Sequence, residues 1–180
     1  MFSNCLNLKY LDISSFNTNN VTKFNSMFRK CISLISLDIS HFITKSASIL
    51  AYTFMFYGSY NIEKITLPLL YSSNVQDISY MFYHCQKLKS LNLVFDNINK
   101  IISMLSMFEG CSMLENLNIE ADNFNTNNLR VMSHMFKDCI SLTSINLSKF
   151  IFKSVYTTNN MFANCSSLQY LIFQILMLVL

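Results

Sequence analysis

The stretch MFRKCISLISLDISHFIT, residues 27–44, contains both halves of a motif that recurs along the whole chain. Its first half, Met-Phe-x-x-Cys, occurs seven times, with Ser59 in place of cysteine in the third copy. The copies begin at Met1, Met27, Met55, Met81, Met107, Met135 and Met161, so that successive copies are 26 or 28 residues apart. A fixed period between about 20 and 50 residues is typical of stacked repeats. Because one unit cannot bury its own apolar face, the sequence predicts a solenoid of about seven 26–28-residue units.

The second half of the motif, Leu-x-x-Leu-x-Leu, predicts a short strand in every unit. In the second unit it consists of Leu34, Leu37 and Ile39. Its last three positions alternate apolar, polar, apolar, which is the period of a strand with one buried face. The polar residue between the apolar ones is Asp12, Asp38, Thr66, Asn92, Asn118 or Asn146, and the last unit has Ile172 there.

The residues that precede each cysteine follow a helical period instead. One stripe of an α-helix, with the spacing i, i+3, i+7 and i+10, is formed in the second unit by Val21, Phe24, Phe28 and Cys31. Asn- and Thr-rich segments such as residues 17–20 come just before the stripe, and such side chains cap a first helical turn. Each unit is therefore expected to be a short strand, a turn and a short helix, which makes the fold class α/β.

The combined string Met-Phe-x-x-Cys-x-x-Leu-x-x-Leu-Asp-Ile-Ser-x-Phe-x-Thr, present as residues 27–44, resembles the BspA-type leucine-rich repeat. That family is found in bacterial and protist surface proteins and overlaps a domain family still catalogued as of unknown function. The resemblance covers essentially the whole chain, residues 1–180, as a single leucine-rich-repeat domain. It implies a curved solenoid at the cell surface or outside the cell, used for adhesion or protein–protein interaction, and it implies no catalytic chemistry.

The composition and the two ends of the chain bear on its possible partners and on its location. The net charge is +3 and the basic residues are scattered, whereas nucleic-acid binding needs a basic stripe, so we expect no nucleic-acid partner. Residues 171–180 are an off-pattern apolar tail, too short for a membrane span, which takes about 20 residues. The chain begins with the repeat motif itself and has no capping unit before it, so we expect a fragment of a longer array. No signal peptide is visible, and a cytoplasmic location stays open. Open apolar ends would allow self-association.

Six cysteines leave three interpretations open. They can be buried thiols that act as small hydrophobic residues. They can form disulfides between neighbouring units, and the three pairs would be Cys5–Cys31, Cys85–Cys111 and Cys139–Cys165. Metal binding is the third interpretation, but one cysteine per unit does not bring four ligands to one point. We expect no metal and no cofactor.

Catalytic constellations are missing from the sequence. The three histidines occupy different repeat positions with no nucleophile or carboxylate converging on them, and the ten acidic residues are dispersed. There is also no glycine-rich phosphate loop and no nucleophile elbow. We therefore expect no catalytic residues and no enzyme activity.

The outward residues of the strands are the candidate binding surface for an unidentified protein partner, since repeat proteins use such extended faces for recognition. The alternative is that their Asp and Asn side chains only hydrogen-bond along the stack. The candidates are Tyr10, Asp12, Ser14, Asp38, Ser40, Asn92, Asn118, Asn146 and Ser148. Two other hypotheses remain: an intracellular interaction scaffold of the same fold, favoured by free thiols, and a fragment of a repeat protein without a function of its own.

Overall fold

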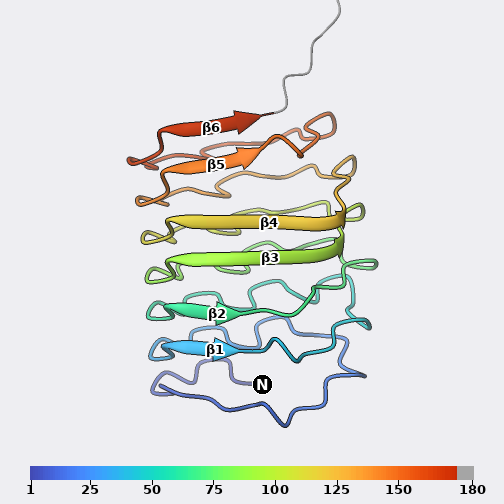
Figure 1. Ribbon diagram of the computed structural model, residues 1–180, viewed down its shortest axis with the longest axis vertical. Helices are drawn as coiled ribbons and strands as arrows, with labels where there is room; N and C mark the ends of the chain where they lie inside the picture. The colour runs from blue at the N-terminus through green and yellow to red at the C-terminus, as the bar shows by residue number, and fades with distance from the viewer. Residues whose placement is uncertain (174–180) are drawn as a thin grey trace, which may run out of the picture.

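The computed structural model describes residues 1–173, and these residues wind into a solenoid whose strands lie one above the other (Figure 1). The strands are β1 (Ser36–Asp38), β2 (Lys64–Thr66), β3 (Ser90–Asn97), β4 (Asn116–Asn123), β5 (Ser144–Leu147) and β6 (Tyr170–Phe173). The expected apolar tail, residues 171–180, begins in β6, and from residue 174 onward it lies outside the described residues.

The strands pair in parallel and each residue pairs with its equivalent in the next unit. β1 pairs with β2, β3 with β4, and β5 with β6. Leu91 stands opposite Leu117 and Ile145 opposite Leu171, each pair 26 residues apart. The predicted solenoid of tandem repeats with a spacing of about 26 residues is therefore confirmed.

The predicted helices are wrong, and with them the α/β class, because residues 1–173 contain no helix. The run before each cysteine is instead a series of tight turns that passes behind the strands (Figure 1). The N–H groups of Met27 and Cys31 bond back three residues within their own unit, to the carbonyls of Phe24 and Phe28. The N–H of Phe28 points to the next unit and donates to Met55 O at 2.9 Å. Successive turns bring every third or fourth side chain inward, which reproduces the helical period without a helix.

Left-handed backbone conformations enforce this run of turns. Two positions adopt positive φ in unit after unit: the residue before Met, such as Ser26 with φ of 55°, and the residue before Cys, such as Lys30 with φ of 54°. A right-handed α-helix cannot continue through such residues. Both glycines of the chain, Gly58 and Gly110, occupy the position before Cys, where their φ values are +69° and +75°.

The Asn- and Thr-rich segments cap turns and not helices. Asn17 Oδ1 accepts the N–H of Asn19 at 3.0 Å, which is the capping chemistry expected of Asn in a tighter loop. The buried hydroxyl oxygen of Thr18 accepts the N–H of Ile43 in the next unit at 2.7 Å. The prediction that these side chains cap the backbone is therefore correct, but they cap turns and not the predicted helices.

The core is a continuous interior between the strands and the turns, as expected for stacked units. Its most regular feature is a ladder of the phenylalanines of the Met-Phe-x-x-Cys motif. Neighbouring rings are nearly parallel, with centroids 5.3 Å apart between Phe56 and Phe82 and 5.5 Å apart between Phe82 and Phe108. The ladder runs through Phe2, Phe28, Phe56, Phe82, Phe108, Phe136 and Phe162.

The six cysteines are free thiols, so the disulfide interpretation is wrong and the buried-thiol interpretation holds for four of them. Cys5 and Cys165, at the two ends of the stack, are half-buried. From the second unit onward each thiol lies close to the carbonyl of the motif Phe one unit earlier, for example Cys111 Sγ at 3.1 Å from Phe82 O. These five cysteines are thus more than small hydrophobic residues, because each supplies a weak donor to a carbonyl of the core.

Candidate functional site

The outward residues of the strands form one continuous surface, which we call the strand face: Ser36, Asp38, Lys64, Thr66, Ser90, Asn92, Asn116, Asn118, Ser144 and Asn146. The parallel register places Ser90 beside Asn116 and Asn92 beside Asn118, so equivalent side chains stand in two columns. Six of the nine predicted residues lie on this face or on its continuation: Tyr10 and Asp12 extend it below β1, and Asp38, Asn92, Asn118 and Asn146 lie within it. Asp38 ends β1.

The exposure of the predicted residues fits a surface role. Tyr10 is exposed over 73% of its surface, and Ser148 alone is half-buried. The remaining seven are exposed: Asp12, Ser14, Asp38, Ser40, Asn92, Asn118 and Asn146.

The three predicted serines donate hydrogen bonds from their backbone N–H groups to the side chain two residues earlier. The N–H of Ser14 donates to Asp12 Oδ1 at 3.0 Å, and Ser40 and Ser148 make the same bond to Asp38 and Asn146 at 2.9 Å. These bonds close the turn that follows each strand. The backbone N–H of Ser14 also lowers the pKa of Asp12, and Ser40 does the same for Asp38, so both carboxyl groups are ionised at neutral pH.

Amide bonding along the stack, the alternative interpretation of this surface, is observed at Asn92 and Asn118. Asn118 Nδ2 donates to Asn92 Oδ1 at 2.8 Å and to Glu120 Oε1 at 2.9 Å. Elsewhere on the strand face, the side chains of Asp38 and Asn146 bond to the turn that follows their own strand. Part of the polar chemistry of the strand face is therefore structural.

Two open hollows bring the predicted residues together. The larger, of about 550 Å³, lies across β2 to β5 and is lined by Asn92 and Asn118 together with Thr66, Ser90, Asn116 and Ser144. The other, of about 460 Å³, contains Tyr10, Asp12, Ser14 and Asp38, joined by Ser36 and His41. Asn146 lines a smaller hollow beside Lys149. Ser40 and Ser148 line none of the three.

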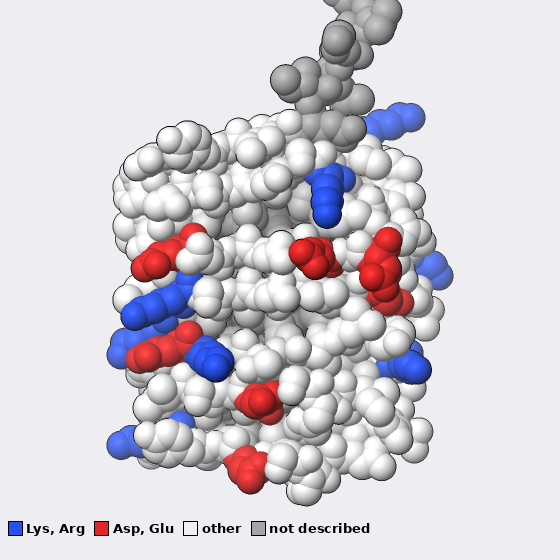
Figure 2. Space-filling view, in the orientation of Figure 1, with Lys and Arg blue, Asp and Glu red and all other residues white. Residues whose placement is uncertain are grey.

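The strand face is seen directly in Figure 2, where most of its surface is uncharged. Acidic groups stand singly near its lower end, charged groups of both signs lie towards its margins, and an acidic and a basic group stand in its upper half between the margins. Amide and hydroxyl groups, which both donate and accept hydrogen bonds, dominate the middle of the face.

Sequence reasoning missed a second surface, made by the outward residues of the motif run. We call it the turn face, and it comprises the residue before Met and the two variable residues between Phe and Cys. Tyr57 and Tyr83, at the first variable position of successive units, stack at 4.6 Å with ring planes 8° apart. Phe54 and Tyr80, each before a Met, stack at 4.9 Å and 6°. The signal in the sequence is that aromatic residues occupy the variable positions of two successive units, whereas the prediction used only the constant residues of the motif.

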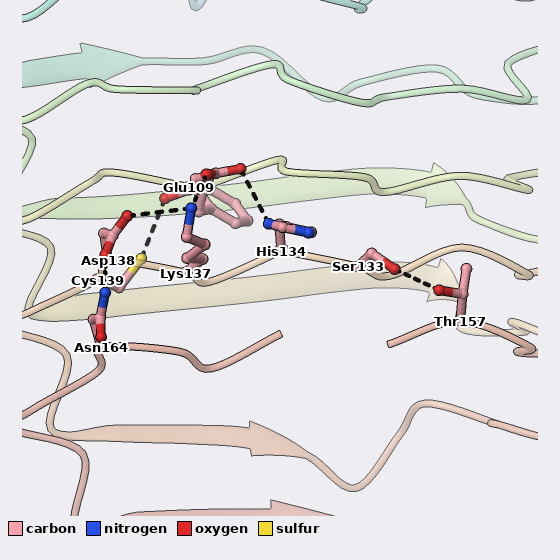
Figure 3. A network of polar contacts seen from close by, with 9 residues as sticks. Glu109, Ser133, His134, Lys137, Asp138, Cys139, Thr157 and Asn164 are labelled. Atoms are coloured by element: carbon pink, nitrogen blue, oxygen red, sulfur yellow. Dashed lines mark hydrogen bonds and ion pairs between the residues drawn. The ribbon is translucent and has the colours of Figure 1, made fainter. Parts of the chain in front are cut away.

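Further along the stack the turn face becomes a polar network (Figure 3). Glu109 Oε1 lies 2.9 Å from Lys137 Nζ, and Glu109 Oε2 lies 3.8 Å from His134 Nδ1. The side chain of Glu109 is only 10% exposed, so Lys137 compensates a largely buried charge. The hydrogen bond that Lys137 donates to Glu109 raises the pKa of Lys137. Asn164 Nδ2 donates to Asp138 Oδ1 at 2.7 Å, which continues the network into the last unit.

Neither surface carries a grouping suited to metal chemistry. Within residues 1–173 no three His, Cys, Asp or Glu side chains are placed to hold a metal ion. Over the same residues there is no helix long and apolar enough to cross a membrane.

Comparison with known proteins gives a family for this fold. The family model described as "Mycoplasma protein of unknown function, DUF285" matches residues 1–93 and again residues 76–174. The chain belongs to this family. The match agrees with the expected overlap between the repeat and a domain family of unknown function. No curated protein and no solved structure matches the chain in these comparisons.

Proposed function

We propose that this DUF285 chain is a non-catalytic repeat protein of the BspA type that binds a protein partner through its strand face. The observation that supports the proposal is the larger hollow of the strand face. It is lined across four strands by side chains such as Ser90, Asn92, Asn116 and Asn118, whose amides and hydroxyls are exposed and held in register. Such an ordered row of donors and acceptors costs little entropy to hold in place when a partner binds.

The proposed setting is the cell surface, where the protein would mediate adhesion, in line with the resemblance of its repeat. An intracellular scaffold of the same fold is the second candidate, and the six free thiols favour it because disulfides are rare inside cells. Protease treatment of intact cells that make the protein separates the two. A surface protein is degraded while the membrane is intact, whereas an intracellular one is degraded only after lysis.

The strand-face proposal is tested by coating beads with the purified chain and measuring binding to an array of purified extracellular proteins. The double variant Asn92→Arg with Asn118→Arg places two long cations in the larger hollow and should abolish binding to any protein the native chain binds. The matched control is Asn74→Arg with Asn159→Arg, which makes the same change at two exposed asparagines outside the strands. Equal loss of binding in both variants would contradict a role for the strand face.

A further inference from the structure

The aromatic part of the turn face consists of four half-buried rings, the stacked pair Phe54 and Tyr80 beside the stacked pair Tyr57 and Tyr83. We call these four residues together the aromatic column. Within each unit the two rings contact each other at an angle: Phe54 and Tyr57 lie 5.7 Å apart and tilted by 54°, Tyr80 and Tyr83 5.7 Å apart and tilted by 65°. Between the units the rings stack almost in parallel. The fold therefore holds all four rings in one fixed arrangement.

The stacking decides which part of each ring can meet a ligand. Because Tyr57 and Tyr83 stack along the solenoid, their facing surfaces are covered. Arg29 covers the other face of Tyr57, with its guanidinium carbon 5.2 Å from the ring centroid. At Tyr57, therefore, the ring edge and the hydroxyl are what remains at the surface. Sugar rings bind aromatic faces, so this arrangement does not favour a glycan, whereas the electropositive edges of aromatic rings attract anionic groups.

Within residues 1–173, the charged side chains that border the aromatic column without an ion-pair partner are basic. Arg29 and Lys30 border it in the preceding unit, and within residues 1–173 neither forms an ion pair. Arg29 Nε is buried without a hydrogen-bond partner in the same part of the chain. The acidic side chain in the first variable position of the unit after Tyr83 is Glu109, and it is already bonded to Lys137. The uncompensated charge beside the rings is therefore positive.

We propose that the aromatic column with Arg29 and Lys30 is a second docking surface, and that it binds an acidic segment of a partner protein. Tyrosine and arginine are the residues that most often contribute binding energy at protein interfaces. The carboxylates of such a segment would pair with Arg29 and Lys30 and accept hydrogen bonds from the tyrosine hydroxyls. Its apolar groups would pack against the ring edges, so that charge and apolar contact would both contribute to binding. This proposal does not depend on the strand face.

The test uses the whole chain and three fluorescein-labelled probes: an oligoglutamate peptide, an oligoglutamine peptide of the same length, and a sulfated oligosaccharide. Fluorescence anisotropy should show binding of oligoglutamate that weakens as salt is added, because exposed charges are screened. Oligoglutamine should not bind. Arg29→Gln with Lys30→Gln should weaken oligoglutamate binding by about tenfold or more, since charged hydrogen bonds contribute about 1.5–3 kcal/mol each.

Two controls make the result specific to this surface. Lys100→Gln with Lys153→Gln removes the same net charge at two exposed lysines elsewhere, and it should leave oligoglutamate binding within about twofold of native. Tyr83→Phe removes only a hydroxyl and should weaken binding several-fold while the protein melts cooperatively. If the Lys100→Gln, Lys153→Gln variant lost as much oligoglutamate binding as the Arg29→Gln, Lys30→Gln variant, the proposal would be overturned. It would also be overturned by stronger, Arg29-dependent binding of the oligosaccharide, which would make the surface a glycan site. Either result leaves the strand-face proposal standing.

Discussion

The Ser59 hydroxyl donates a 2.8 Å hydrogen bond to the carbonyl oxygen of Phe28, one unit earlier in the stack. Cysteine occupies the same position in the other units, and its thiol contacts the equivalent carbonyl, as Cys85 does with Phe56 at 3.3 Å. Ser59 and Cys85 are both fully buried. The single departure from the Met-Phe-x-x-Cys motif therefore preserves the property the position requires, a small side chain with a hydrogen-bond donor.

We expect Ser59→Ala to lower the free energy of unfolding by about 1–2 kcal/mol, because a buried carbonyl loses a donor. Ser59→Cys restores the motif residue and should cost less than about 1 kcal/mol, since the thiol keeps the contact. Urea unfolding followed by circular dichroism measures both variants. If Ser59→Cys proved as destabilising as Ser59→Ala, the donor would not be what selects residues at this position.

Stability should fall as the pH rises above 9. Burial raises the pKa of Cys31 from its ordinary 9.0 to about 11, and it also raises the pKa of Cys85, Cys111 and Cys139. Between pH 9 and 11 the unfolded chain has released the Cys31 proton while the folded chain keeps it. The unfolded state then binds fewer protons, so the free energy of unfolding decreases with rising pH.

Two single substitutions check this dependence in opposite directions. Cys31→Ser removes one titrating thiol and should flatten the fall of the urea midpoint between pH 9 and 11. Ser59→Cys adds a buried thiol and should make the fall steeper. Identical slopes in the native protein and both variants would mean that other groups account for the effect.

Self-association through the last strand is a further expectation. In β6 the side chains of Leu171 and Phe173 are 38% and 41% exposed, and Phe173 lines a hollow of about 500 Å³ with Phe152 and Phe162. Sedimentation should show concentration-dependent association that Leu171→Lys reduces, because a cation opposes burial of this apolar surface. Ile140→Lys, at a 48% exposed residue on another part of the surface, is the control and should change nothing.

The sequence was sufficient for the repeat, its period and the inward residues, and insufficient for the conformation of the motif run. Val21, Phe24, Phe28 and Cys31 have the spacing of a helix stripe, and a run of tight turns has nearly the same spacing. The two are distinguished by left-handed residues, and several of these are Ser, Lys, Phe or Tyr, which give no sign of positive φ in a sequence as Gly does. Gly58 and Gly110 were the clearest hint and Asn4, Asp138 and Asn164 a weaker one, and all five occupy the motif position before Cys.

The candidate surfaces were predictable to different degrees. The period-2 pattern of the strands placed Asn92 and Asn118 on the outside, and the structure agrees. The pattern could not show that Asp12, Asp38 and Asn146 close their own turns, since that depends on backbone geometry after the strand. The aromatic column depends on which units carry aromatic residues at variable positions, so it becomes visible only when the units are stacked in register.

The two glycines offer a matched pair for a final prediction about packing on the turn face. A Cβ added at Gly110 would lie 2.8 Å from Cγ and Nδ1 of His84, whereas one at Gly58 would lie 3.4 Å from the flexible Lys30 Cγ. Both positions have positive φ, so alanine is strained at each by about 1 kcal/mol. Gly110→Ala must in addition displace an imidazole ring and should cost about 2–3 kcal/mol in total.

Removing the imidazole tests whether this collision is the cause. In a His84→Ala background, Gly110→Ala should cost only about 1 kcal/mol, the same as Gly58→Ala in the native chain, because only the backbone strain remains. Urea unfolding of the four proteins in the His84 and Gly110 cycle gives the coupling free energy directly. A coupling near zero would show that His84 does not pack on Gly110, and that the side chains before Cys do not contact the next unit as the stacked turns require.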